Sequence, residues 1–200
     1  MAVPTAKYMK KKFNCIQGCS DCCIYRDYYP SVEYGKIGVL VLPKEKTAIE
    51  RLAKSMGIRV RILPRLAVGK SSPEKIIAYQ MMGKNDDGDL CPFLDVESKE
   101  RSDHGGFKCK IYSDRPLACR AYPVIEAKQK TARFDSHCQF CKKFSRTKAS
   151  SEGLQQEFEA LAEIRASVIA DNDVSIWRYA TAVGKSGDLL SEGWVRESGC

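Results

Sequence analysis

Apolar residues recur at helical spacing in two stretches of the chain. Over residues 43–56 they follow an i, i+3, i+4, i+7 pattern, with Pro43 suited to a first helical turn and Gly57 to a helix end. A second apolar stripe, over residues 154–168, has the same period. The pattern predicts one helix in each stretch. A shorter third helix is predicted after them, with apolar positions at Trp177, Ala180 and Val183.

Two stretches between the first two helices have strand-like patterns. Residues 59–62 alternate between polar and apolar side chains, and residues 76–79 are β-branched and aromatic. Residues 69–73, rich in glycine, serine and proline, predict a turn between them. These elements predict an α+β fold, with a small loop-rich core and short strands flanked by helices. We expect residues 1–145 to form this domain and residues 146–200 to form a helical extension packed on it.

Cysteine is the residue type that changes this picture most. The chain has ten cysteines among 200 residues. Four lie within nine positions near the N-terminus: Cys15, Cys19, Cys22 and Cys23. The others follow at wider intervals: Cys91, Cys109, Cys119, Cys138 and Cys141, with Cys200 standing apart. The nine grouped cysteines are candidate metal ligands, because close pairs chelate from one turn while distant cysteines close a site through the fold.

The expected compartment supports metal binding over disulfides. The longest apolar run, residues 38–42, is far too short to span a bilayer. The N-terminal residues are basic and lack the apolar segment of a secretory signal, so we expect a cytoplasmic protein. Thiols stay reduced there, which favours metal binding or redox chemistry. Intracellular proteins of hyperthermophiles are an exception to this rule.

The net charge of +8 would suit contact with nucleic acid or with an acidic partner. The basic residues are, however, spread along the chain, and Lys10–Lys12 is the only tight run. Each metal-bound thiolate also contributes a negative charge that the formal count omits. We therefore do not expect nucleic acid binding.

Some cysteine pairs have the spacing at which both side chains can bind one metal ion, and one adjacent pair does not. The x2 spacing at which one turn wraps a metal occurs at residues 19–22 and at residues 138–141. Cys22 and Cys23 are adjacent, and neighbouring side chains usually diverge. Either one of the two is a ligand and the other is structural, or they serve two sites.

Three blocks of the chain resemble one known family. They are Cys22-Cys23, Cys91-Pro92-Phe93-Leu94 and the segment from Cys109 to Pro123, with the pattern C-x-I-Y-x-x-R-P-x-x-C-R-x-Y-P. In this order they are similar to the CxxCxxCC cysteine-cluster family, described as a zinc- or iron-chelating domain, which also includes bacterial flagellin lysine N-methylases. The resemblance covers roughly residues 13–125.

The resemblance implies metal ligation by cysteines that here include Cys19, Cys22 and Cys23. The family usually opens C-x2-C-x2-CC, whereas three residues separate Cys15 from Cys19, so Cys15 departs from the pattern. Cys138 and Cys141 lie outside the family's core pattern, and their assignment depends on spacing alone.

The irregular spacing favours iron–sulfur over zinc. Four-thiolate zinc sites usually present two paired C-x2-C turns, whereas single cysteines in separate blocks are more typical of an iron–sulfur cluster. We predict a [4Fe–4S] cluster, with Zn²⁺ as the alternative, or both in separate sites. His104 and His137 are further candidate ligands, and His137 is the better one because it precedes Cys138, although a solvated loop histidine is the commoner case.

Two arginines flank Cys119 in the third block. Arg115 and Arg120 are predicted to neutralise a thiolate-bound cluster or to donate hydrogen bonds to its sulfur atoms. The alternative is that they pair with carboxylates such as Asp95 or Glu97.

The sequence thus predicts a metal-binding protein with an electron-transfer, sensing or accessory role and an unidentified protein or redox partner. One alternative is a zinc-stabilised interaction module that uses the basic arm at Lys10–Lys12. Another, implied only by the family resemblance, is a protein-lysine methyltransferase, for which the chain offers no glycine-rich nucleotide loop after a strand. The sequence does not decide whether the protein is an enzyme.

Overall fold

The computed structural model describes residues 13–24, 35, 37–84, 90–128, 131–144, 153–168, 174–181 and 192–197. The helices are α1 (Asp21–Ile24), α2 (Pro43–Ser55), α3 (Leu117–Ala121), α4 (Gln139–Phe144) and α5 (Gln155–Ser167), with a 3-10 turn η1 (Tyr112–Asp114). The strands are β1 (Val39–Val41), β2 (Ile62–Gly69), β3 (Lys75–Met81), β4 (Leu94–Asp95), β5 (Lys108–Cys109), β6 (Val124–Lys128), β7 (Thr131–Phe134), β8 (Ser175–Ala180) and β9 (Gly193–Arg196). This mixture confirms the α+β class. The basic run Lys10–Lys12, Val183 and Cys200 lie outside the described residues.

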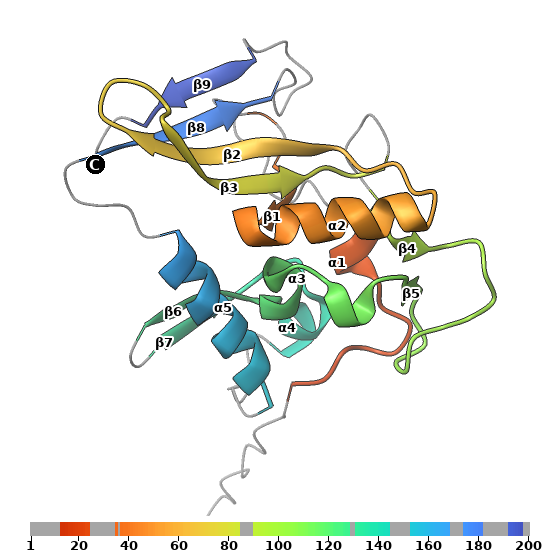
Figure 1. Ribbon diagram of the computed structural model, residues 1–200. Helices are drawn as coiled ribbons and strands as arrows, with labels where there is room; N and C mark the ends of the chain where they lie inside the picture. The colour runs from red at the N-terminus through yellow and green to blue at the C-terminus, as the bar shows by residue number, and fades with distance from the viewer. Residues whose placement is uncertain are drawn as a thin grey trace, which may run out of the picture.

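An antiparallel five-stranded sheet forms one part of the molecule, in the order β1-β3-β2-β8-β9. Helix α2 lies along the sheet, below β2 and β3 in the view of Figure 1. Its buried residues Ile49 and Ala53 pack with Val41 of β1 and Met81 of β3. Burial of this apolar stripe explains why α2 forms where the sequence pattern predicts it.

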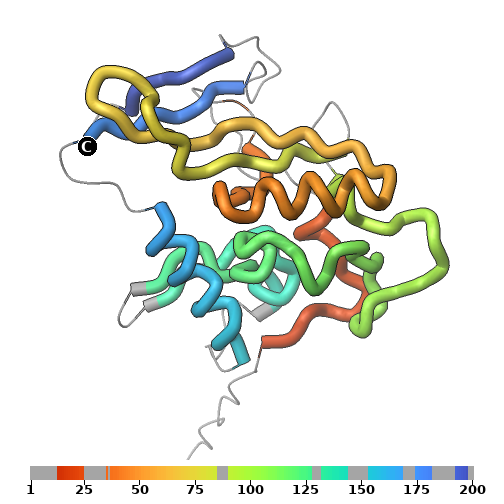
Figure 2. Tube along the Cα trace, viewed as in Figure 1, coloured from red at the N-terminus to blue at the C-terminus, as the bar shows by residue number. Residues whose placement is uncertain are grey.

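The second part lies on the other side of α2 and, apart from α5, consists of short elements. It contains α1, α3, α4 and α5 and the two-stranded sheets β4–β5 and β6–β7, as the tube in Figure 2 also shows. Helix α5 packs against α3 and β6. None of the helices in the described residues is long and apolar enough to cross a membrane.

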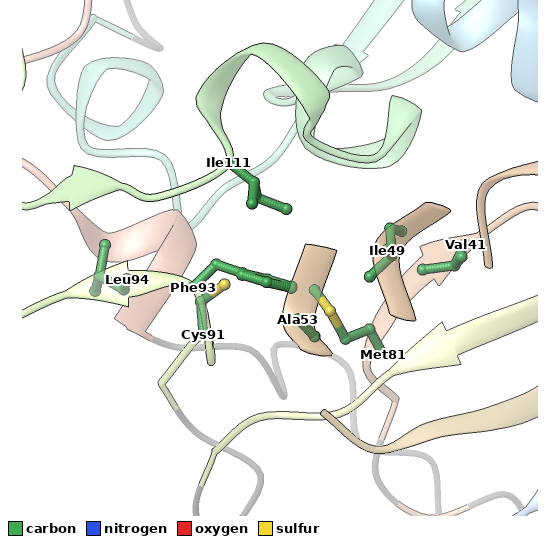
Figure 3. Close-up of a cluster of buried hydrophobic side chains, with 8 residues drawn as sticks. All are labelled: Val41, Ile49, Ala53, Met81, Cys91, Phe93, Leu94 and Ile111. Atoms are coloured by element: carbon green, nitrogen blue, oxygen red, sulfur yellow. The ribbon is translucent and has the colours of Figure 1, made fainter. Parts of the chain in front are cut away.

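Two apolar cores hold these parts together. The first core, shown in Figure 3, consists of Val41, Ile49, Ala53, Met81, Cys91, Phe93, Leu94 and Ile111. Its Phe93 ring points toward Ala53 and Met81 and is fully buried. The second core consists of Leu42, Leu117, Ala121, Val124, Leu154, Ala160, Leu161 and Ile164. The first core therefore joins the sheet and α2 to the segments that carry Cys91 and Ile111.

The predicted helices over 43–56 and 154–168 are confirmed as α2 and α5, and residues 76–79 lie within β3. The prediction of a helix through Trp177 and Ala180 is wrong, because these residues belong to β8. There Trp177 pairs with Ala67 of β2 and with Arg196 of β9. Pairing on both sides outweighs the helical spacing of a few apolar positions, and aromatic residues also favour strands.

The prediction of a strand at residues 59–62 is also wrong in position, because β2 begins only at Ile62 and continues to Gly69. Pro64 lies inside this strand and pairs with Tyr79 of β3 just before an irregularity in the register. Proline occurs in strands mainly at edges and bulges, so a sequence pattern containing it does not predict a strand.

Candidate metal centre

Helix α1 carries Cys22 and Cys23 and is fixed against the segment that contains Cys91. Its first turn forms because the N–H groups of Cys23 and Ile24 donate to the carbonyl of Ser20, at 2.8 and 3.1 Å. At its end, the carbonyls of Cys23 and Ile24 accept hydrogen bonds from the N–H groups of Cys91 and Leu90, each at 2.6 Å. These long-range bonds place Cys23 beside Cys91.

The β4–β5 pair then brings Cys109 to the same place. Leu94 pairs with Cys109 across the two strands, and the N–H of Lys110 donates to the carbonyl of Phe93 at 2.9 Å. The chain continues through η1 into α3, which contains Cys119. Cysteines from α1, the turn before β4, β5 and α3 are thus brought together by the fold.

The loop of Cys19 is held by the segment that contains His104. The N–H of Gly18 donates to the carbonyl of His104 at 2.7 Å, and the His104 Nε2 atom lies 3.0 Å from the carbonyl oxygen of Cys19. A Cβ atom on Gly106 would lie only 2.3 Å from that same oxygen, so this close approach requires glycine. The structure therefore places the His104 ring in a backbone contact that positions Cys19.

Cys138 and Cys141 lie at the start of α4 and are positioned by Asp135, a residue that sequence reasoning missed. Asp135 is 1% exposed, and its carboxylate accepts a hydrogen bond from the N–H of His137 at 2.7 Å. The His137 Nδ1 atom lies 3.1 Å from the same carboxylate oxygen, which places the imidazole beside a carboxylate. The Cys138 N–H donates to the Asp135 carbonyl. The aspartate two residues before His137 was the available signal, because Asp side chains commonly bond to nearby backbone N–H groups.

Two contacts hold α4 against the N-terminal segment. The Phe13 and Phe140 rings meet edge to face at a centroid distance of 4.9 Å. The Gln139 side chain donates a hydrogen bond to the carboxylate of Asp21. These contacts bring residues 138–141 next to the segment that holds Cys15 and Cys19, although more than 100 residues separate them in the sequence.

The electrostatics divide the described cysteines into two groups. The inner thiol group is Cys23, Cys91, Cys109 and Cys119. Burial, with smaller contributions from the neighbouring thiols of Cys91, Cys23 and Cys119, raises the pKa of Cys109 to about 12. Cys91 is 3% exposed and belongs to the first core. Cys23, Cys91 and Cys109 of the inner group thus lie against the apolar interior.

The outer thiol group is Cys15, Cys19, Cys138 and Cys141. Burial raises the pKa of Cys15 to about 11, with further contributions from Cys19 and Cys138, although much of the Cys15 residue is exposed. Burial also raises the pKa of Cys19. The pKa of Cys138 is lowered, because the Cys141 thiol donates a hydrogen bond to its sulfur.

Cys22 and Cys23, which are adjacent in the sequence, connect the inner and outer thiol groups. The Cys22 Sγ and Cys23 Sγ atoms are 3.9 Å apart, and the Cys23 thiol also raises the pKa values of Cys15 and Cys19. The two groups are therefore neighbours that adjoin at α1. This grouping was not predicted, since sequence spacing alone leaves open which cysteines share a metal.

The donor set fits a thiophilic metal, because zinc and iron–sulfur centres are both held by thiolates. In the described part of the chain, no three Cys, His, Asp or Glu side chains form a ready-made metal site. The thiols lie instead as pairs and near neighbours. Closing a four-thiolate site therefore requires side-chain rotation after the backbone has brought the cysteines together.

Arg115 and Arg120, the two arginines beside Cys119, lie at a pocket. Arg115 stacks over the Tyr112 ring, with 4.2 Å from its guanidinium carbon to the ring centroid. Arg115 and Arg120 both line an open pocket of about 360 Å³ between α2, η1, α3 and α5. Arg120 also contributes to the lowered pKa of Glu163, after the larger effect of Lys44. The predicted contact of these arginines with cluster sulfur stays a prediction.

Asp95, one of the two alternative partners proposed for the arginines, has contacts of its own. The Asp95 carboxylate accepts a hydrogen bond from the N–H of Ser98 at 3.1 Å. One of its oxygens lies 4.0 Å from the Lys110 ammonium. Asp95 is thus engaged by the β4–β5 region.

Comparison with family models gives one match. Residues 14–142 match the model of the family CxxCxxCC, described as "Putative zinc- or iron-chelating domain". The match covers more than half of the chain and includes nine cysteines, which are the eight cysteines of the two groups and Cys22. Comparisons with curated proteins and with solved structures give no match. The chain therefore belongs to the CxxCxxCC family of zinc- or iron-chelating domains, and its dispersed cysteines are those of a metal-binding protein.

Proposed function

We propose that the protein binds a [4Fe–4S] cluster through the inner thiol group and serves in electron transfer, sensing or as an accessory protein in the cytoplasm. The observation that carries this proposal is the meeting of Cys23, Cys91, Cys109 and Cys119, of which the first three belong to the first core or pack against it. Each comes from a different segment of the chain. An unidentified redox or protein partner would receive the electron or the signal.

Burial is the physical reason to assign the cluster to this group. Thiolates ligate iron–sulfur clusters, and the reduction potential depends on solvent exposure and on hydrogen bonds to sulfur. Cys91 is buried, and Cys23 and Cys109 pack against the first core. When bound, the cluster would supply one-electron redox chemistry, and the surrounding apolar side chains would limit access of water.

The outer thiol group favours zinc. It contains two close pairs, Cys15-x3-Cys19 and Cys138-x2-Cys141, and α4 lies beside the N-terminal segment through Phe13 and Phe140. Two close pairs separated by a long stretch of chain are typical of structural four-thiolate zinc sites. We assign this group a structural zinc ion that fixes residues 138–141 to the N-terminal segment.

Anaerobic purification followed by metal and sulfide analysis tests both assignments. The expected result is iron with a matching amount of inorganic sulfide, a brown protein with visible charge-transfer absorbance, and one zinc ion per chain. Zinc alone, without iron or sulfide, would overturn the cluster assignment. Iron without zinc would overturn only the assignment of the outer group.

A further inference from the structure

A small polar pocket lies in the five-stranded sheet and has no part in the proposed metal sites. It is lined by Ile37, Arg65, Gln80, Arg178 and Tyr179. These residues come from β2, β3, β8 and the segment just before β1. The pocket has about 20 Å³ of space, enough for one or two water-sized groups. It can therefore take the terminal group of a ligand.

Arg65 reaches this pocket because of a bulge in β2. Pro64 pairs with Tyr79, but the next pair joins Leu66 to Ala78, so Arg65 is an extra residue with no partner in β3. On the other side of β2, Leu66 pairs with Arg178 of β8. A bulge of this kind redirects a side chain, and bulges are common next to functional sites.

A rigid frame surrounds the Arg65 guanidinium group. Gln80 is 2% exposed; its Oε1 atom accepts a hydrogen bond from the N–H of Gly38 at 3.0 Å, and its Nε2 atom donates to the carbonyl of Pro64 at 3.2 Å. Arg65 donates to the Gly38 carbonyl at 3.2 Å. A Cβ atom on Gly38 would lie 2.3 Å from the carbonyl oxygen of Met81, so glycine is required there. The bulge and Gly38 are thus held in one fixed arrangement.

The charges in the pocket are unbalanced around Arg65. Within the described residues, its one hydrogen bond goes to a neutral carbonyl, and no carboxylate pairs with it. Arg178 forms an ion pair with Glu197 at 2.8 Å, and the Tyr179 hydroxyl donates to Glu192 at 3.0 Å. Arg65 is half-buried as a residue, and partial withdrawal of its guanidinium from water, together with the charge of Arg178, lowers the pKa of Arg65 to about 10, which leaves it charged at neutral pH. A cation partly withdrawn from water without an anionic partner is costly, and an anion would relieve that cost.

We propose that this pocket binds an oxyanion, a carboxylate or phosphoryl group of a small molecule, with Arg65 as its main ligand and Arg178 beside it. The planar guanidinium group of Arg65 carries five donors, of which the Gly38 carbonyl uses one. The remaining donors suit two-point recognition of carboxylate or phosphate oxygens. The Arg178–Glu197 pair keeps Arg178 in place at the edge of the pocket.

The test is thermal unfolding of the metal-loaded chain in chloride, acetate and phosphate at equal ionic strength, with metal content checked before each scan. At an anion concentration ten times Kd, the midpoint of the wild-type chain should rise by about 3–6 °C relative to chloride. Calorimetric titration with inorganic phosphate and with acetate gives the affinities directly. A response to phosphate alone identifies a phosphoryl site, and a response to both anions identifies a general oxyanion site; either result supports the proposal.

Arg65→Met should remove the anion response, while Arg61→Met, at an exposed arginine just before the same strand, should retain it. Arg65→Met removes a charge that lacks a partner, so we expect this variant to fold. Arg65→Lys keeps the charge and loses the two-point geometry, and should bind about tenfold more weakly. Absence of binding to the wild-type chain, or an equal response in Arg65→Met, would overturn the proposal. Neither result bears on the metal sites.

Discussion

The sheet region and the cysteine-bearing region of this protein are built in different ways. In the sheet, β2 and β3 run for eight and seven residues, and α2 spans thirteen residues with a buried apolar stripe. In the cysteine-bearing region, β4 and β5 have two residues each, and α1 has four. Regular pairing and apolar burial stabilise the first region. The second depends on individual hydrogen bonds between turns, and we expect it to need bound metal for stability.

The two regions are not independent, because the first core belongs to both. Phe93 and Cys91 lie beside Ala53 and Met81 in this core. Glu45 adds a second connection: its carboxylate accepts hydrogen bonds from the N–H of Leu42 at 2.8 Å and from the N–H of Leu117 at 2.7 Å. Metal loss should therefore loosen the cysteine-bearing region first and weaken its contact with α2.

The largest effect is expected from metal removal. A chelator under anaerobic, reducing conditions should lower the hydrogen-exchange protection of the Cys91 and Gly18 amides by at least about a hundredfold, because their bonds to Cys23 and His104 join separate turns. The amides that pair β2 with β3 should keep most of their protection. Exchange measured by mass spectrometry tests this difference, with metal-saturated chelator as the control. An equal loss of protection in both regions would contradict the claim that only the cysteine-bearing region needs bound metal for stability.

The next largest effect should come from the shared core. Phe93→Ala removes a fully buried ring between the two regions and should lower the free energy of unfolding by about 3–5 kcal/mol. Val96→Ala, at a position 37% exposed nearby, is the matched control and should cost less than about 0.5 kcal/mol. Denaturant unfolding of the metal-loaded chain measures both. If Phe93→Ala cost no more than the control, Phe93 would not couple the regions.

A smaller effect is expected at the connection between α2 and α3. Glu45→Ala leaves the N–H groups of Leu42 and Leu117 without their carboxylate acceptor and should cost about 1–3 kcal/mol. Glu50→Ala on the same helix removes an i, i+4 pair with Lys46 and should cost about 0.3–0.5 kcal/mol. The same unfolding assay compares them. Similar losses in the two variants would show that the carboxylate of Glu45 does not join the helices.

Metal affinity should also depend on pH. Burial raises the pKa of Cys109 to about 12 and of Cys15 to about 11, so both thiols are protonated near neutral pH when no metal is bound. Metal binding must release these protons, and affinity should rise with pH by a factor of about ten per pH unit for each proton released. Zinc competition titrations of the metal-free chain at two pH values measure this slope. An affinity that does not change with pH would show that the thiols are not the ligands.

Local patterns were enough to predict α2 and α5, because each buries a stripe that is visible in the sequence. The position of β2 and the nature of β8 could not be predicted in this way. Pro64 and the extra residue Arg65 interrupt the β2 pattern, and Trp177 of β8 becomes a strand residue through pairing with Ala67 and Arg196. Those pairings join residues far apart in the sequence.

The candidate site shows the same division between local and long-range information. Residue type and spacing identified the cysteines as candidate ligands, and the family match supports metal binding. Their grouping depends on contacts that spacing does not encode, such as the bond from the Cys91 N–H to the Cys23 carbonyl and the bond from Gln139 to Asp21. The fold therefore adds which thiols are neighbours.

The most direct test of the central claim compares Cys119→Ser with Cys15→Ser after anaerobic purification. Iron, sulfide, zinc and visible absorbance are measured for both variants and for the wild-type chain. Cys119→Ser, in the inner group, should lose iron, sulfide and visible absorbance and keep zinc. Cys15→Ser, in the outer group, should lose zinc and keep the iron–sulfur absorbance. Loss of iron in Cys15→Ser, with iron retained in Cys119→Ser, would contradict the assignment of the cluster to the inner thiol group.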